Sequence, residues 1–140
     1  MNKVTDNYQI YLEATEKAAI AAAKLRGNND GKAADKAATD AMRSVLKKSK
    51  ILTRVVIGEG ERDDAPMLFI GEELGNQSSS LKIDIAVDPL ECTNHCANNL
   101  PDALAVLAAS EKGSLLHAPD TYMNKPVSYT HLRAHETDSY

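Results

Sequence analysis

Residues 83–93 read IDIAVDPLECT, an apolar run that ends in carboxylates. A short, unbroken aliphatic run of this kind predicts a buried strand, which delivers Asp88 and Glu91 at its C-terminal end. An earlier stretch, VVIGEGERDD at residues 55–64, has the same form. Acids at the ends of buried strands repel one another and lose hydration, and a bound divalent cation is the commonest remedy. The two stretches together predict a metal-dependent site for an anionic substrate such as a phosphate ester.

The composition is that of one soluble globular domain or a piece of a larger one. The chain has 140 residues, of which 43% are hydrophobic and only 4% aromatic, so aliphatic side chains must fill the core. A formal net charge of −4 argues against non-specific nucleic-acid binding. No apolar run approaches a membrane span and no signal-like region opens the chain, so we expect a cytoplasmic protein.

Helical and strand periods alternate along the chain. We expect helices over about residues 6–25 and 32–48, the second with Asp30 as its N-cap. Strands are expected at about residues 54–58, 83–88 and 103–109, a short element within 65–75, a polar surface loop at 76–80 and a last short strand near 115–116 after Gly113. This order predicts an α/β fold.

The end of the second strand carries the most specific constellation. Asp88 and Glu91 can reach one metal ion or bridge two, and Thr93 can hydrogen-bond a water molecule. Pro89 predicts a rigid turn between them, and a helix starting here would present free N–H groups to a phosphate. The alternative is a capped turn in which Asp88 and Thr93 have structural roles only.

Four other candidates for ligand or metal binding occur in the sequence. Gly58 and Gly60 flank Glu59 in a loop with four acids, which is either a solvated surface turn or a ligand loop. Asp35, in the first turn of the second helix, either complements the helix dipole or binds a ligand. The remaining candidates are a small zinc site at Cys92, His95 and Cys96, which lacks the usual spacing, and the pair His131 and His135, which lacks helical support.

Five stretches together carry a family resemblance: KAAD at 32–35, VIGEGE at 56–61, DDAPML at 63–68, IDIAVDP at 83–89 and LHAPD at 116–120. They resemble class II fructose-1,6-bisphosphatases, which belong to the lithium-sensitive, metal-dependent sugar-phosphatase superfamily together with inositol monophosphatases. The resemblance extends over about residues 8–125. It implies a layered α/β/α/β/α fold in which two helices pack on a mixed sheet. Residues 1–125 would be the N-terminal portion of such a domain, and residues 126–140 a tail unrelated to the family.

The resemblance also implies the roles of individual residues. Two divalent ions, Mg or Mn, would be held by two pairs of carboxylates, Asp35 with Glu59 and Asp88 with Glu91. Asp63 would act with Thr93 to orient and deprotonate the attacking water. The remaining implied residues are Lys32 in catalysis and Glu91, Cys92, Thr93 and Tyr122 in substrate binding.

The chain departs from the family pattern at three points. The family has Gly where Cys92 stands, and it has a catalytic Lys where Gly31 stands, so that Lys32 comes one residue later. Family members are also much longer and form their site with a C-terminal lobe. The implied activity is hydrolysis of the 1-phosphate of fructose 1,6-bisphosphate in gluconeogenesis, with sedoheptulose 1,7-bisphosphate as a second substrate, by homo-oligomers of full length. The alternatives are an inositol-monophosphatase-like enzyme and a metal-binding fragment without turnover.

Overall fold

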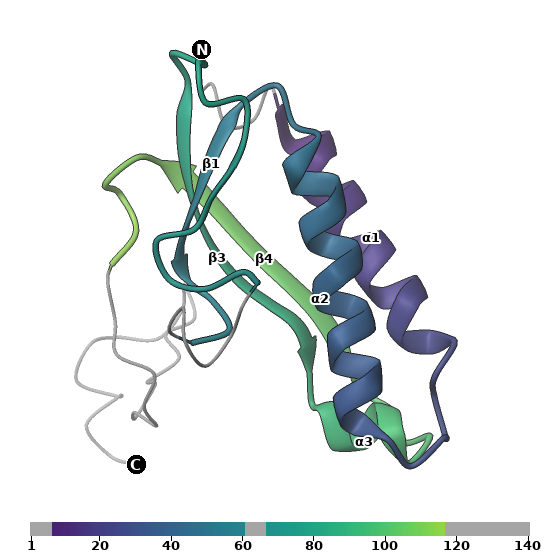
Figure 1. Cartoon of the computed structure of the whole chain (residues 1–140). Helices are drawn as coiled ribbons and strands as arrows, with labels where there is room; N and C mark the ends of the chain where they lie inside the picture. Colours follow the sequence, from purple (N-terminus) through teal and green to yellow (C-terminus); the bar gives the residue numbers. More distant parts are fainter. Residues whose placement is uncertain (1–6, 61–66, 117–140) are drawn as a thin grey trace, which may run out of the picture.

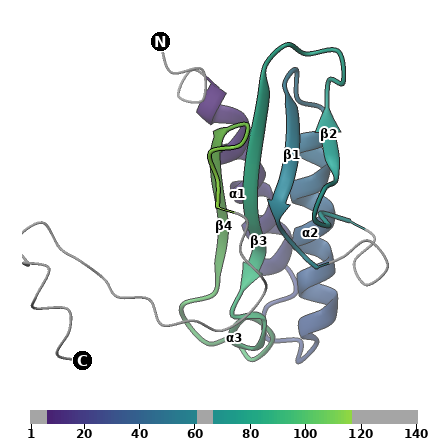
Figure 2. The same ribbon diagram turned by 90° about the vertical axis from the view of Figure 1, so that its left-hand side faces the viewer.

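Two helices cover one face of a four-stranded sheet in the computed structural model, which describes residues 7–60 and 67–116. The helices α1 (Tyr8–Ala23) and α2 (Gly31–Lys47) lie side by side along that face (Figure 1). Figure 2 shows the sheet from the side that these helices leave uncovered. The described residues therefore have the α/β architecture expected from the sequence. The other elements are β1 (Leu52–Ile57), β2 (Glu73–Gly75), β3 (Lys82–Glu91), α3 (Thr93–Ala97) and β4 (Leu104–Glu111).

The order of the strands brings the two acid-bearing segments together. The sheet has the order β2-β1-β3-β4, in which β1 and β3 are parallel neighbours and the other pairs are antiparallel. In the parallel pair Leu52 lies opposite Lys82, and Ile57 lies opposite Ala86 near the C-terminal ends. The segments after β1 and at the end of β3 consequently meet at the same edge of the sheet.

Small side chains let the helices approach the sheet closely. The helix α1 buries Tyr11, Ala14, Ala18 and Ala22, and these pack with Ala34, Ala38, Met42 and Leu46 of α2. The strands contribute Val55, Ile83, Ile85 and Val87 to the same core. Because alanine has no flexible side chain to order, the layers can pack tightly although few aromatic residues are present.

Several sequence-based expectations need correction. The predicted turn at Pro89 is wrong, since β3 continues through it to Glu91. The ladder between β3 and β4 shifts register between Asp88 and Glu91, so Pro89 sits at an irregularity where no backbone N–H is needed. No strand forms at residues 115–116, where Leu116 is exposed. The loop expected at residues 76–80 is confirmed, and the strand expected at 103–109 forms as β4, Leu104–Glu111.

Two further features of the helices bear on the site and its setting. The N-cap predicted at Asp30 is confirmed, because its Oδ1 accepts a hydrogen bond from the N–H of Ala33 at 2.9 Å. This cap fixes the start of α2, from which Asp35 projects one turn later. Within the described ranges, neither long helix is apolar enough over a sufficient length to cross a bilayer.

Candidate active site

An open cavity of about 820 Å³ lies where the C-terminal ends of β1 and β3 meet the start of α2. Carboxylates from three segments far apart in the sequence line it: Asp35 from α2, Glu59 after β1, and Asp88 and Glu91 from β3. These are the four residues that the resemblance implies as metal ligands. The other implied site residues that line the same cavity are Lys32, Cys92 and Thr93.

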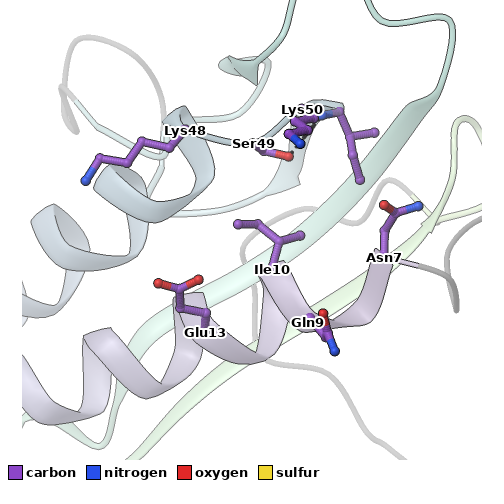
Figure 3. A pocket seen from close by; sticks show the side chains of 8 residues that line it. Asn7, Gln9, Ile10, Glu13, Lys48, Ser49 and Lys50 are labelled. Carbon is purple, nitrogen blue, oxygen red and sulfur yellow. Dashed lines mark hydrogen bonds between the residues drawn. The ribbon is translucent and has the colours of Figure 1, made fainter.

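A second, smaller pocket contains none of these residues. It has a volume of about 330 Å³ and lies between the start of α1 and the end of α2 (Figure 3). Its lining includes Ile10 and Glu13 of α1 on one side and Lys48 and Lys50, which follow α2, on the other. The larger cavity is therefore the candidate active site.

The carboxylates in the larger cavity are crowded and partly removed from water. Burial raises the pKa of Asp88 to about 6, and a hydrogen bond with Glu91 and the negative charge of Glu91 act in the same direction. The N–H of Leu90, which donates to Asp88 Oδ1 at 3.1 Å, opposes the shift, and the charge of Asp35 adds a smaller increase. Burial also raises the pKa of Asp35. The cavity thus concentrates negative charge that a cation would stabilise.

The turn after β3 places a hydroxyl and a thiol at the cavity wall. Cys92 has a left-handed backbone with φ of 61°, the conformation that the family's Gly at this position would adopt without strain. Its exposed thiol lies 3.8 Å from Glu91 Oε1. Thr93 Oγ1 donates to the carbonyl of Leu90 at 3.1 Å. A helix does begin after this turn, but α3 is only five residues long.

The zinc alternative finds no support in the geometry. Cys92 lines the cavity, whereas the buried thiol of Cys96 points to the carbonyl of Ala22 at 3.5 Å and His95 Nδ1 contacts the carbonyl of Pro101 at 2.8 Å. Among residues 7–60 and 67–116, no three His, Cys, Asp or Glu side chains are grouped closely enough to hold a metal by themselves. The predicted carboxylates of the described residues therefore line one cavity without forming a closed cage.

Comparison with known proteins decides the family. Residues 7–135 match the sequence profile described as bacterial fructose-1,6-bisphosphatase, glpX-encoded. The chain belongs to this family.

Curated proteins similar to this chain include two bisphosphatases of the same name. A Prochlorococcus marinus (strain AS9601) protein named D-fructose 1,6-bisphosphatase class 2/sedoheptulose 1,7-bisphosphatase is 56% identical over 117 residues, covering 84% of this chain and 35% of the relative. A protein of the same name from Thermosynechococcus vestitus is 51% identical, covering 81% of this chain and 36% of the relative. The chain thus spans about a third of the length of these relatives.

A solved structure supports the fold of the glpX-type chain. The extragenic suppressor from Pyrococcus furiosus superposes with a TM-score of 0.52, covering 79% of this chain and 42% of that one at 19% identity. At this identity the likeness concerns the fold alone.

Some predicted site residues of this glpX-type chain lie outside the described residues. They are Asp63, Tyr122 and the pair His131 and His135, so their placement stays a prediction. The family match reaches residue 135, past residue 126, where we predicted a tail unrelated to the family. That predicted boundary also lies outside the described residues.

Glu72, which lies outside the cavity and bonds residues next to it, was not identified from the sequence. Glu72 is a buried carboxylate that bonds Arg43 and the backbone of Leu68. A carboxylate in a segment of uncertain structure gives no sequence signal of such a role, because the role depends on how the loop folds back.

Proposed function

We propose that the cavity is part of the active site of a metal-dependent sugar bisphosphatase. The reaction is hydrolysis of the 1-phosphate of fructose 1,6-bisphosphate to fructose 6-phosphate and phosphate, a step of gluconeogenesis, with sedoheptulose 1,7-bisphosphate as a second substrate. One observation carries the proposal: four carboxylates from three distant segments line one cavity together with Lys32 and Thr93. The names of the cyanobacterial relatives supply the substrate class.

The carboxylate oxygens of the cavity suit hard divalent ions such as Mg²⁺, which prefer oxygen ligands. Magnesium in proteins is commonly held by one or two carboxylates and completes its shell with water and substrate phosphate. Carboxylates that line an open cavity match this habit, and no closed cage is required. We assign Asp35 and Glu59 to one Mg or Mn ion, and Asp88 and Glu91 to the other. Burial and the nearby charge of Glu91 raise the pKa of Asp88, and a bound cation would offset both by stabilising the carboxylate.

The remaining side chains of the cavity have roles that follow from their bonding. Because Thr93 donates its hydroxyl proton to the carbonyl of Leu90, its oxygen is oriented and keeps lone pairs to accept a hydrogen bond from a water molecule. Lys32 is exposed at the cavity wall and offers a positive charge to a phosphate group. The bound ions, when present, supply charge neutralisation of the phosphoryl oxygens and acidify water. We propose Asp63 as the proton acceptor, with Cys92 and Tyr122 among the substrate contacts.

Four further properties belong to the same proposal. We propose that the protein acts in the cytoplasm. We also propose that a full-length protein of the relatives' size forms a homo-oligomer. Its partner is the sugar bisphosphate rather than nucleic acid, because the negative charge and the acid-lined cavity oppose a polyanion without bound cations. We also propose that the 140 residues on their own bind ions and substrate with impaired turnover, since the curated relatives are about three times as long.

The test measures binding of fructose 1,6-bisphosphate to the chain in Mn²⁺ by calorimetry. Asp88→Asn is expected to weaken binding at least tenfold, whereas Glu73→Gln on the exposed face of β2, outside the cavity, leaves it unchanged. Inositol 1-phosphate is expected to bind more weakly than the bisphosphate. Equal affinity in Asp88→Asn and the wild type, or a preference for the inositol phosphate, would contradict the proposal. Phosphate release measured on the same samples decides whether turnover is impaired.

A further inference from the structure

Glu72 is a buried carboxylate that does not line the cavity. Its side chain is only 7% exposed, and both of its oxygens are engaged. Oε1 accepts from Nε of Arg43 at 2.8 Å, and Oε2 accepts a short hydrogen bond from the N–H of Leu68. A charged group in this position is costly unless it is paired and hydrogen-bonded, so its two bonds hold it to one geometry.

Leu68 is the residue through which Glu72 reaches the cavity. It is completely buried and has a left-handed backbone with φ of 53°, a conformation that a leucine keeps only when its surroundings require it. In this conformation the carbonyl of Leu68 accepts a hydrogen bond from the N–H of Glu59 at 3.0 Å. A Cβ on Gly58 would lie 2.1 Å from the same carbonyl oxygen, so residue 58 must be glycine for the approach to occur.

Neighbouring backbone bonds hold the rest of this segment against β1. The N–H of Val55 donates to the carbonyl of Glu72 at 2.9 Å, and the N–H of Gly71 donates to the carbonyl of Val55 at 2.8 Å. The N–H of Ile70 donates to the carbonyl of Gly60 at 3.0 Å. The segment from 68 to 72 therefore braces the backbone on both sides of Glu59.

The partner of Glu72 belongs to the helix that carries another cavity acid. Arg43 lies on α2, two turns after Asp35, and its side chain is about one-third exposed. The ion pair consequently joins the helix of Asp35 to the segment that holds Glu59. These two carboxylates are the ones assigned to a single ion.

We propose that Glu72 is a positioning residue for the cavity. Pinned by Arg43, it holds Leu68 so that the Leu68 carbonyl fixes the backbone of Glu59 and sets Glu59 relative to Asp35. The inference rests on the proposed function in taking Glu59 and Asp35 as ligands of one ion. The bonding chain itself is independent of whether an ion is bound.

Amide hydrogen exchange of the ion-free chain, read residue by residue by NMR, tests the bonding chain directly. In Glu72→Gln the Glu59 amide is expected to exchange at least tenfold faster than in the wild type, because the ion pair that holds Leu68 is lost. Amides of α1 and of the centre of β3 are expected to keep their rates. The matched control is Glu73→Gln, which changes the exposed neighbour and is expected to leave Glu59 protected. Unchanged protection of Glu59, or equal acceleration at all amides, would overturn the proposal.

If Glu72→Gln does not fold, variants of Arg43 test the same ion pair from its other partner. Arg43→Met removes the ion pair from a side chain that water already reaches, and Arg43→Lys keeps the charge without the guanidinium. Glu59 exchange is expected to be fastest in Arg43→Met and intermediate in Arg43→Lys, and Mn²⁺ affinity is expected to fall at least tenfold in Arg43→Met. Loss of affinity with Glu59 still protected would overturn the positioning role. A wild type that takes up no Mn²⁺ would refute the proposed function, while the exchange rates would still decide the role of Glu72.

Discussion

Gly31 at the start of α2 packs directly against Thr93 at the start of α3. A Cβ on residue 31 would lie 2.9 Å from Thr93 Cγ2, which is closer than two carbon atoms can approach without one of them moving. Because Thr93 Oγ1 is bonded to the carbonyl of Leu90, the threonine cannot rotate away and keep that bond. A side chain at residue 31 would thus compete for space with the methyl group of Thr93.

Gly31→Ala is predicted to displace the Thr93 side chain while changing the free energy of unfolding only slightly. The gain in helix propensity is worth up to ~1 kcal/mol and offsets the crowding, so the free energy of unfolding changes by less than that. The Thr93 methyl resonance is expected to shift, and binding of fructose 1,6-bisphosphate in Mn²⁺ is expected to weaken. An unchanged methyl resonance together with wild-type binding would show that residue 31 does not constrain Thr93.

Cys92→Gly is predicted to stabilise the chain. A Cβ in the left-handed region costs about 1–2 kcal/mol, part of which the greater freedom of glycine in the unfolded chain cancels. The free energy of unfolding in urea is expected to rise by about 0.5–1 kcal/mol. The matched control is Cys92→Ala, which removes the thiol and keeps the Cβ, and it is expected to stay within about 0.5 kcal/mol of the wild type. Equal stabilisation by both variants would assign the effect to the sulfur instead.

The raised pKa of Asp88 predicts a dependence of stability on pH in the absence of divalent ions. The carboxyl ionises near pH 4 in the unfolded chain but has a pKa of about 6 in the folded one, so the unfolded state releases its proton first. The contribution of Asp88 to the free energy of unfolding is therefore fully present below pH 4 and is lost as the pH rises through 6. Because the group is half-buried and water screens it, we expect a loss of about 1 kcal/mol.

Asp88→Asn removes that titration and isolates its contribution. Urea unfolding at pH 5 and pH 8 is expected to show a smaller fall in stability for the variant than for the wild type. The other ionisable groups are common to both proteins, so only the difference between the two proteins is interpreted. Identical falls would mean that Asp88 ionises normally in the folded state.

Asp30→Ala is predicted to lower stability through the start of α2. The variant leaves the N–H of Ala33 without its side-chain acceptor, and loss of an N-cap of this kind typically costs about 1 kcal/mol. The matched control is Asp40→Ala on the exposed face of the same helix, whose ion pair with Lys36 is expected to contribute less than about 0.5 kcal/mol. The prediction fails if thermal unfolding shows the two variants to be equally stable.

Most of the secondary structure could be predicted from the sequence, because the local sequence preferences agree with the fold. The apolar runs at 83–88 and 54–58 form strands, and the cap at Asp30 follows from the preference of aspartate for that position. Because the acids were placed at the ends of the predicted strands, the sequence also predicted that they lie close together. This prediction holds because β1 and β3 are parallel neighbours, which no local signal specifies.

What could not be predicted depends on tertiary contacts. Pro89 was expected to end a strand, but a register shift between Asp88 and Glu91 lets β3 pass through it. The pairing of Arg43 with Glu72 joins residues 29 positions apart and depends on a loop whose course is set by the left-handed Leu68. Such pairs arise only once the loop has folded against α2.

Titration of the ion-free chain with Mn²⁺, followed by calorimetry, tests the central claim most directly. The account predicts two bound ions, with uptake reduced in Asp35→Asn, Glu59→Gln, Asp88→Asn and Glu91→Gln and unchanged in the control Asp102→Asn, an exposed acid outside the cavity. Uptake that is indifferent to all four cavity carboxylates, or that is abolished instead by Cys92→Ser and Cys96→Ser, would contradict it.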